Sequence, residues 1–197
     1  MLILAIDTSC FRGGVGVFEE GIPIFYLPFP EERKHIIYLP IYIQRVLEES
    51  RKRLEDIDLI AVALGPGSFT GVRVGLAVAK SMSYALSKPI KGVPSLDALA
   101  SNFKGETVLP TIKVRKNQYV GALFKGGIPP EKLSDIILGT MEAFKKDGIL
   151  FLDESWNNYT FLMLKGVALL AKFLFEKNGS DDPFIISPIY IKGGQPC

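Results

Sequence analysis

The chain has 197 residues, of which 48% are hydrophobic, with 23 basic and 21 acidic side chains. This length and apolar content allow one domain or two small lobes with a sizeable core. The formal net charge of +2 is too small for a protein that binds nucleic acid on its own. Two cysteines, Cys10 and Cys197, give no disulfide framework, so a reducing cytoplasm is expected.

Neither a signal peptide nor a membrane span is expected. The first apolar run lacks a basic start and is interrupted at Asp7. The longest apolar segment, residues 161–175, contains two lysines and is too short to cross a bilayer. It is predicted to be a buried helix.

The first half of the chain alternates between strand-like and helical patterns, which indicates an α/β fold. A hairpin turn is predicted at Glu19-Glu20-Gly21, between two strands. In chain order the pattern predicts strands at 2–7, 13–18 and 22–27, a helix at 32–50, a strand at 58–64, a helix at 68–87, a strand at 90–93 and a helix at 95–102.

The second half carries fainter patterns and is predicted to form a separate lobe. The boundary is placed at Phe103-Lys104-Gly105-Glu106, which divides the chain into an N-terminal lobe, 1–103, and a short C-terminal lobe, 104–197. The last residues are expected to pack back on the first lobe. Beyond the boundary the pattern predicts a hairpin from 107–114 and 118–124, a break at 126–130, a helix at 132–146, a strand at 149–152 and a helix at 159–177.

A glycine-rich turn is the most informative segment of the chain. It reads Gly65-Pro66-Gly67-Ser68-Phe69-Thr70-Gly71 and joins a predicted strand to a predicted helix. Gly65 and Gly67 can adopt backbone angles closed to other residues, and Ser68 is placed to cap the helix. Gly71 and Gly75 share one helix face and permit a close approach. The turn matches neither the P-loop nor the dinucleotide spacing, so a structural turn and an anion site both stay open.

Several segments resemble the signature of the TsaB (YeaZ) family. Besides the glycine-rich turn, the resemblance is carried by Leu2-Ile3-Leu4-Ala5-Ile6-Asp7-Thr8-Ser9, Lys34-His35-Ile36-Ile37-Tyr38-Leu39-Pro40, Gly92-Val93-Pro94-Ser95-Leu96 and Pro188-Ile189-Tyr190-Ile191-Lys192, which follow one another in the family's order. The resemblance implies the two-lobed actin-like ATPase (ribonuclease H-like) fold. It also implies a cytoplasmic role in forming N6-threonylcarbamoyladenosine at position 37 of tRNA.

One segment departs from the family pattern. Lys113-Val114-Arg115 stands where the family usually has Asp-Ala-Arg, so the acidic side chain is replaced by a lysine. Any role for a carboxylate at this point of the second lobe is therefore lost.

The turn Asp7-Thr8-Ser9 is the candidate nucleotide contact. In actin-like ATPases an aspartate at this point acts with Mg²⁺ and phosphate, but a glycine usually follows it, and here Thr8 stands in that place. Aspartate is also a common turn residue, so a structural role and weak binding of ATP or ADP with Mg²⁺ both stay open. No other cofactor is expected.

Neither a catalytic residue nor a metal site is assigned. His35 is the only histidine, so the chain cannot form the two-histidine metal site of the family's catalytic paralogue, TsaD. Ser68 has no base near it in sequence and does not stand in a nucleophile elbow.

The two long predicted helices of the first lobe are apolar around much of their circumference. The apolar arc of the first covers roughly 200°, wider than one core face requires. Complete burial inside the chain and a partner surface both explain this, and the resemblance favours the partner surface. The predicted interface residues are His35, Ile36, Leu39, Ile43, Phe69, Val72, Arg73, Leu76 and Lys80.

Two functions are therefore compared. In the first, the chain is a non-catalytic partner of TsaD, with the ATPase TsaE as a further partner, self-pairing when alone, and tRNA bound only through the complex. In the second, it is a self-sufficient ATP-dependent kinase or ATPase of the same fold. The single histidine and the Thr8-Ser9 turn favour the first.

Overall fold

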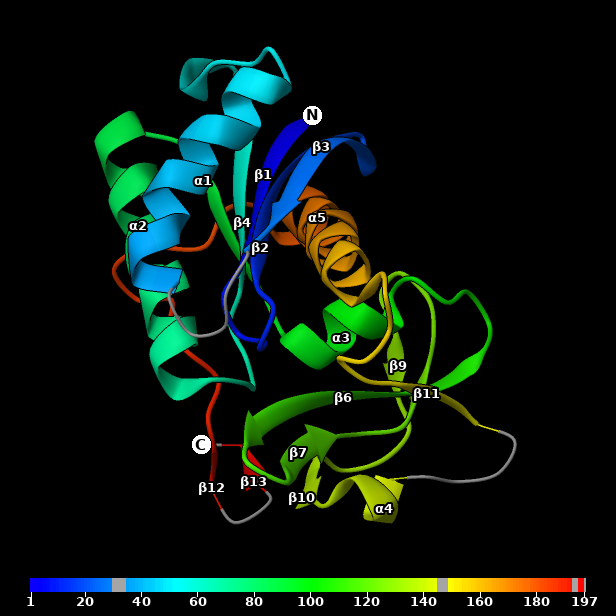
Figure 1. The fold of residues 1–197 in the computed structure, drawn as a ribbon. Coiled ribbons are helices and arrows are strands. Elements are labelled where there is room, and N and C mark those ends of the chain that lie inside the picture. The colour runs from blue at the N-terminus through cyan, green and yellow to red at the C-terminus, as the bar shows by residue number, and fades with distance from the viewer. Residues whose placement is uncertain (30–34, 145–148, 193–194, 197) are drawn as a thin grey trace.

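The computed structural model describes residues 1–29, 35–144, 149–192 and 195–196. Figure 1 shows two sheets, one above the other, with helices on both faces of the upper sheet. The upper sheet has the strand order β3-β2-β1-β4-β5. Its strands are β1 (Leu2–Asp7), β2 (Gly14–Glu19), β3 (Ile22–Pro28), β4 (Leu59–Ala63) and β5 (Ile90–Val93).

The upper sheet is antiparallel on one side of β1 and parallel on the other. β1 pairs antiparallel with β2, which continues into β3 through the predicted turn, where Glu20 and Gly21 both have positive φ angles. β1, β4 and β5 run parallel to one another. Every residue of β1 and β4 is buried, as expected for parallel strands covered on both faces. All five strands were predicted to within about a residue at each end.

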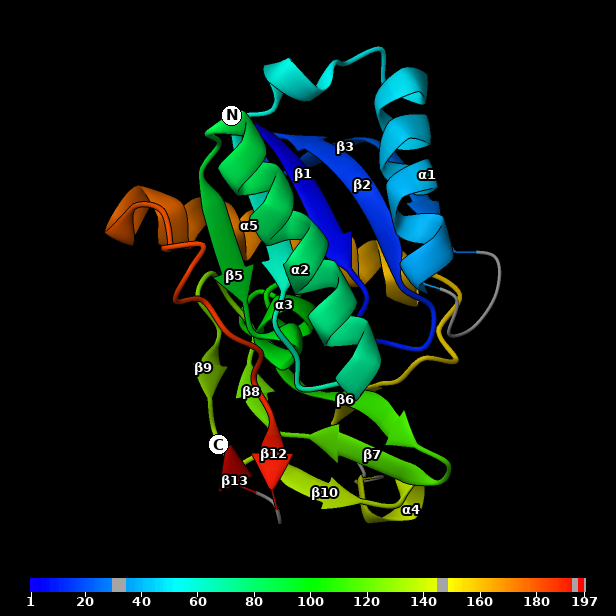
Figure 2. The ribbon, with the colours of Figure 1, turned by 90° about the vertical axis from the view of Figure 1, so that its left-hand side faces the viewer.

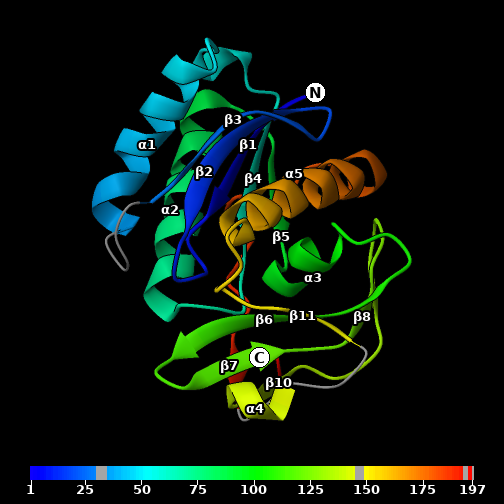
Figure 3. The same ribbon diagram turned by 45° about the vertical axis from the view of Figure 1, so that its right-hand side comes forward.

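Two layers of helices cover this sheet (Figures 1 and 3). On one face lie α1 (His35–Glu49) and α2 (Phe69–Leu86), and on the other α5 (Tyr159–Asn178) with α3 (Ser95–Ala100). Alternate residues of β1 enter the two cores: Leu4 packs in the α1–α2 layer and Ile3 in the α3–α5 layer. The predicted helices are confirmed, although residues 32–34, predicted to begin the first one, lie outside the described residues.

The lower sheet is built mainly from short strands. Its order is β10-β7-β6-β8-β9, and β11 pairs parallel with β6. The elements are β6 (Thr107–Arg115), β7 (Gln118–Gly121), β8 (Phe124–Lys125), β9 (Glu131–Lys132), β10 (Ile137–Gly139), α4 (Met141–Phe144) and β11 (Leu150–Leu152). A short 3₁₀ turn, η1 (Leu54–Asp56), precedes β4 in the first lobe.

The helix predicted over 132–146 is wrong for the residues that the structure describes. Glu131–Lys132 and Ile137–Gly139 are strands instead, and the only helix between them and residue 144 is α4. Only Ile136 and Phe144 are buried in this stretch, so an amphipathic helix would have had little apolar surface to bury. Pairing of β10 with the edge of β7 satisfies the backbone instead. Residues 145–148 of the prediction lie outside the described residues.

The C-terminal segment runs back along the first lobe (Figure 2). The Asp181 N–H donates to Ile90 O at 2.9 Å, and its carboxylate accepts from Lys91 Nζ at 2.6 Å and Gly92 N at 2.8 Å. Farther on, the Ile189 N–H donates to Leu64 O at 2.8 Å. The segment thereby covers the edge of β5 and ends in the hairpin of β12 (Ile191–Lys192) and β13 (Gln195–Pro196), beside the lower sheet. Within the described ranges, no helix combines the length and apolar character needed to cross a membrane.

Candidate functional site: a cleft between the two sheets

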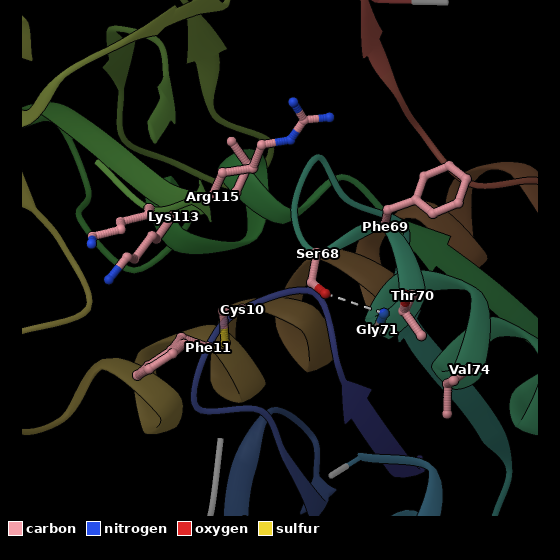
Figure 4. Close-up of a pocket in the computed structure, with 11 residues that line it drawn as sticks. Cys10, Phe11, Ser68, Phe69, Thr70, Gly71, Val74, Lys113 and Arg115 are labelled. Carbon is pink, nitrogen blue, oxygen red and sulfur yellow. Dashed lines mark hydrogen bonds between the residues drawn. The ribbon is translucent and has the colours of Figure 1, made fainter. Parts of the chain in front are cut away.

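A cavity of about 510 Å³ opens between the two lobes (Figure 4). One wall is the turn after β1 and the beginning of α2, and the other is the β6–β7 hairpin. The lining residues are Cys10, Phe11, Ser68, Phe69, Thr70, Gly71, Val74, Lys113, Val114, Arg115 and Lys116. The glycine-rich turn and the departure from the family pattern in the second lobe therefore face each other across one cavity.

The predicted nucleotide contact is sealed beneath this cavity. Asp7, Thr8 and Ser9 are each 0% exposed. Asp7 Oδ1 accepts from the amide of Ser9 at 2.8 Å and from its hydroxyl at 2.6 Å, while Oδ2 accepts from Cys10 Sγ at 2.7 Å. Both carboxylate oxygens of Asp7 therefore have hydrogen-bond partners inside the chain. In this structure the three residues join parts of the chain to one another, and their role as a nucleotide contact stays a prediction.

The same turn fastens three elements together. The Thr8 hydroxyl donates to Gly71 O at 2.6 Å, and the Ser68 amide donates to Ser9 O at 2.7 Å, which joins β1 to the beginning of α2. The hydroxyl of Ser95, the first residue of α3, donates to Ser9 Oγ at 2.9 Å and accepts from the Gly65 amide at 3.0 Å. This buried network fixes the floor of the cleft.

The glycines of the turn are required by this close packing. A Cβ at Gly67 would overlap Ser9 O, and one at Gly71 would overlap Thr8 O. A Cβ at Gly75, one helical turn later, would overlap Thr8 Oγ1. Gly65 has a φ of +91°, which side chains disfavour, and Ser68 caps α2 by accepting from Gly71 N at 3.3 Å. The glycine pattern thus brings the α2 backbone against the β1 turn.

The wall opposite α2 is basic. Lys113 Nζ lies 5.1 Å from the centre of the Phe11 ring, and Arg115 and Lys116 are exposed at the end of the hairpin. No carboxylate lines the cavity. With Lys113 in place of the aspartate that the family pattern has, the side chains of this wall attract anions.

Glu154 is a site residue that the sequence analysis missed. It follows β11, and its Oε1 accepts from the Phe11 amide at 3.1 Å, which bridges the two lobes. Its Oε2 is buried and has no hydrogen-bond partner. Burial, reinforced by the nearby charge of Asp7, raises the pKa of Glu154 to about 7. No sequence signal pointed to it, because Phe11 and Glu154 are 143 positions apart.

The predicted partner surface is only partly accessible. Leu39, Ile43, Val72 and Leu76 were assigned to it but belong to the chain's own core. Leu39, Ile43 and Leu76 pack in the core between these helices and the upper sheet, and α1 and α2 also contact each other. Phe69 and Arg73 are exposed, and Lys80 is half-buried with its Nζ donating to Ile186 O at 3.0 Å. The side chains of His35 and Ile36 lie outside what the structure describes.

Among the described residues, potential metal ligands do not gather at one point, and the Cys10 thiol is protonated. Across residues 1–29, 35–144, 149–192 and 195–196, no three His, Cys, Asp or Glu side chains converge as a metal ion would require. Burial, with the charges of Asp7 and Glu154, raises the pKa of the Cys10 thiol, which keeps the sulfur protonated.

Comparison with known proteins identifies the family. The family model for TsaD, tRNA N6-adenosine threonylcarbamoyltransferase, matches residues 27–133, more than half of the chain. A Bacillus subtilis protein named tRNA threonylcarbamoyladenosine biosynthesis protein TsaB is 33% identical over 141 residues, 68% of this chain. The chain belongs to the TsaB (YeaZ) family. A Buchnera aphidicola TsaB is also 33% identical, over 64% of this chain.

Relatives within the TsaB family match over unequal spans. The chain spans 61% of the length of the Bacillus protein and 59% of the Buchnera protein. The structure of YeaZ from Pseudomonas aeruginosa superposes with a TM-score of 0.80 at 21% identity, over 96% of this chain and 99% of that one. This likeness establishes that the two chains share their two-lobed α/β fold.

Replacing Gly71 by alanine should destabilise the first lobe. The added methyl would collide with the backbone of Thr8 and force α2 away from β1, at a cost of about 3 kcal/mol. Urea unfolding measures the change, with Ser81→Ala, at an exposed position of the same helix, as the control. Equal stability of the two variants would show that the close approach is dispensable.

Replacing Glu154 by glutamine should change how stability depends on pH. The folded-state pKa of Glu154 lies above its ordinary value of 4.5, so the folded chain binds more protons between pH 4.5 and 7. Stability of the native chain should therefore fall as pH rises through this window, while glutamine is not affected. The free energy of unfolding of the variant, measured relative to that of the native chain, should increase by up to about 3 kcal/mol between pH 4.5 and pH 8. A constant difference between the two proteins in urea unfolding at both pH values would contradict the assignment.

Proposed function

We propose that this chain is a non-catalytic partner of a TsaD-type transferase in forming N6-threonylcarbamoyladenosine at position 37 of tRNA. Membership of the TsaB family carries the proposal, together with relatives named for biosynthesis of this nucleoside. The protein would act in the cytoplasm, with a TsaE-type ATPase as a further partner, and would pair with itself when alone. In this proposal, tRNA is held by the assembled complex.

The sealed floor of the cleft supports a non-catalytic role. In the alternative, a self-sufficient ATPase or kinase, an aspartate at the end of β1 would need to contact Mg²⁺. Here Asp7 is buried and already accepts three hydrogen bonds. Lys113 lines the cavity at the position where the family has a carboxylate. Any affinity for ATP or ADP with Mg²⁺ should therefore be low, and turnover of ATP by the isolated chain negligible.

Helices α1 and α2 remain the best candidates for the pairing surface. They form the outer layer on one face of the upper sheet in Figure 2, and the C-terminal segment runs along α2. Ile41 on α1 is 56% exposed and Tyr84 on α2 is 69% exposed. Exposed side chains of this size are typical of protein interfaces. Two such helix pairs meeting about a twofold axis would form a four-helix contact.

Omission of the chain should abolish modification of tRNA in a reconstituted reaction. The mixture contains TsaD, TsaE, the other accessory proteins and an unmodified tRNA transcript, and the product is the modified nucleoside measured by mass spectrometry. Addition of the chain should restore the product. Full modification without it would refute the proposed function, and ATP turnover by the chain alone would support the kinase or ATPase alternative.

Ile41→Glu should disrupt pairing without unfolding the chain. A charge placed at the centre of an apolar contact is buried without a partner, whereas at this exposed position the monomer tolerates it. Mass measurement of the chain alone and with TsaD should show a loss of assembly of at least tenfold in affinity. Leu133→Glu, on an exposed site of the second lobe, is the control. Normal assembly of a folded Ile41→Glu variant would show that α1 is not part of the pairing surface. Val72→Glu should instead unfold the lobe, because Val72 is 1% exposed.

A further inference from the structure

A second cavity, of about 590 Å³, adjoins the first and shares three of its residues, Phe69, Val114 and Arg115. Its other lining residues come from the turn before α2, the β7 and β10 strands and the C-terminal segment: Pro66, Gly67, Arg73, Gln118, Val120, Leu138, Ile189, Tyr190 and Ile191. The two cavities form one groove along the line where the lobes meet. We propose that this groove binds a single-stranded segment of RNA.

The charges along the groove are all positive. Arg73, Lys113, Arg115 and Lys116 line it, and no aspartate or glutamate does. In the part of the chain that the structure describes, the side chains of Arg115 and Lys116 have neither an ion pair nor a hydrogen bond. The whole chain has nearly equal numbers of acidic and basic residues, so this cluster of positive charge is local and does not show in the net charge. A row of unpaired cations is complementary to a phosphate backbone.

Aromatic rings line the same groove. The Arg73 guanidinium carbon lies 3.9 Å from the centre of the Phe69 ring and 5.5 Å from that of Tyr190, and Arg73 Nε donates to the Tyr190 hydroxyl at 2.6 Å. The two ring centres are 5.1 Å apart. Phe69 nevertheless remains 57% exposed. Aromatic rings and arginine planes held together in this way are surfaces on which unpaired bases stack.

The size of the groove favours a strand over a free nucleotide. Each cavity alone has the volume of an ordinary small-molecule pocket. The cations are spread over both, with Lys113 in one and Arg73 in the other, so a strand can place successive phosphates along them while its bases reach Phe69 and Tyr190. An acidic peptide would use the cations but gain less from the stacked rings. The inference goes beyond the proposed function, in which tRNA is held only by the assembled complex.

Fluorescence anisotropy with a labelled RNA hairpin tests the proposal on the full chain. The hairpin with a single-stranded loop should bind with a Kd on the order of 10–100 μM at low salt, and a fully paired RNA duplex should bind more weakly. Phe69→Ala should weaken hairpin binding about tenfold with little change in salt dependence. The double variant Arg115→Ala, Lys116→Ala should also weaken it about tenfold and reduce the salt slope by about two phosphate contacts.

Matched variants lie outside the groove. Tyr26→Ala removes an exposed ring from β3, and Lys125→Ala removes an exposed cation from β8; both should leave hairpin binding unchanged. Absence of hairpin binding, or equal binding by the Phe69→Ala variant, would overturn the proposal. So would equal binding of a poly-glutamate peptide, or displacement of the hairpin by ATP at concentrations near the hairpin's own Kd, which would indicate a peptide or a mononucleotide site. These results are independent of the reconstituted reaction, because the chain can be required there without contacting RNA.

Discussion

The backbone contact between Thr8 and Gly71 is the constraint on which the rest of the structure depends. The Thr8 hydroxyl donates to Gly71 O, while Gly71 and Gly75 leave the space that Thr8 occupies. This contact sets the distance and angle between the central strand and α2. It therefore also sets the position of Phe69 and Arg73, which stand at the beginning of that helix, facing the second lobe.

The same contact decides what the end of β1 can do. Here the turn folds over Asp7, and Ser9 and Cys10 donate to both of its oxygens. Opening the turn for a ligand would break these hydrogen bonds and the links to α2 and α3 together. The turn therefore belongs to the buried framework that joins β1, α2 and α3.

The cleft itself combines two unlike electrostatic features. The wall of the cavity carries Lys113, Arg115 and Lys116, whereas Glu154, which does not line this cavity, is half-buried and accepts a hydrogen bond from the Phe11 amide. Desolvation raises the pKa of this carboxyl to about 7, so near neutral pH it carries less negative charge than a solvent-exposed glutamate. The hydrogen bond between Glu154 and Phe11 joins the two lobes, while Arg115 and Lys116 remain exposed to solvent.

The sequence by itself determined the first lobe almost completely. Its strands and helices were predicted because glycines, caps and apolar periodicity act between near neighbours along the chain, and Ser68 with Gly71 is the clearest case. The second lobe was predicted less well, since its short strands, such as β10, form through pairing with β7 rather than through local preference. Only the tertiary structure decided which faces of α1 and α2 are buried, that Asp7 is buried and hydrogen-bonded within its own turn, and that Glu154 reaches Phe11. It alone brought Tyr190 onto Arg73, 117 positions away, because contacts between residues so distant in sequence leave no local pattern to detect.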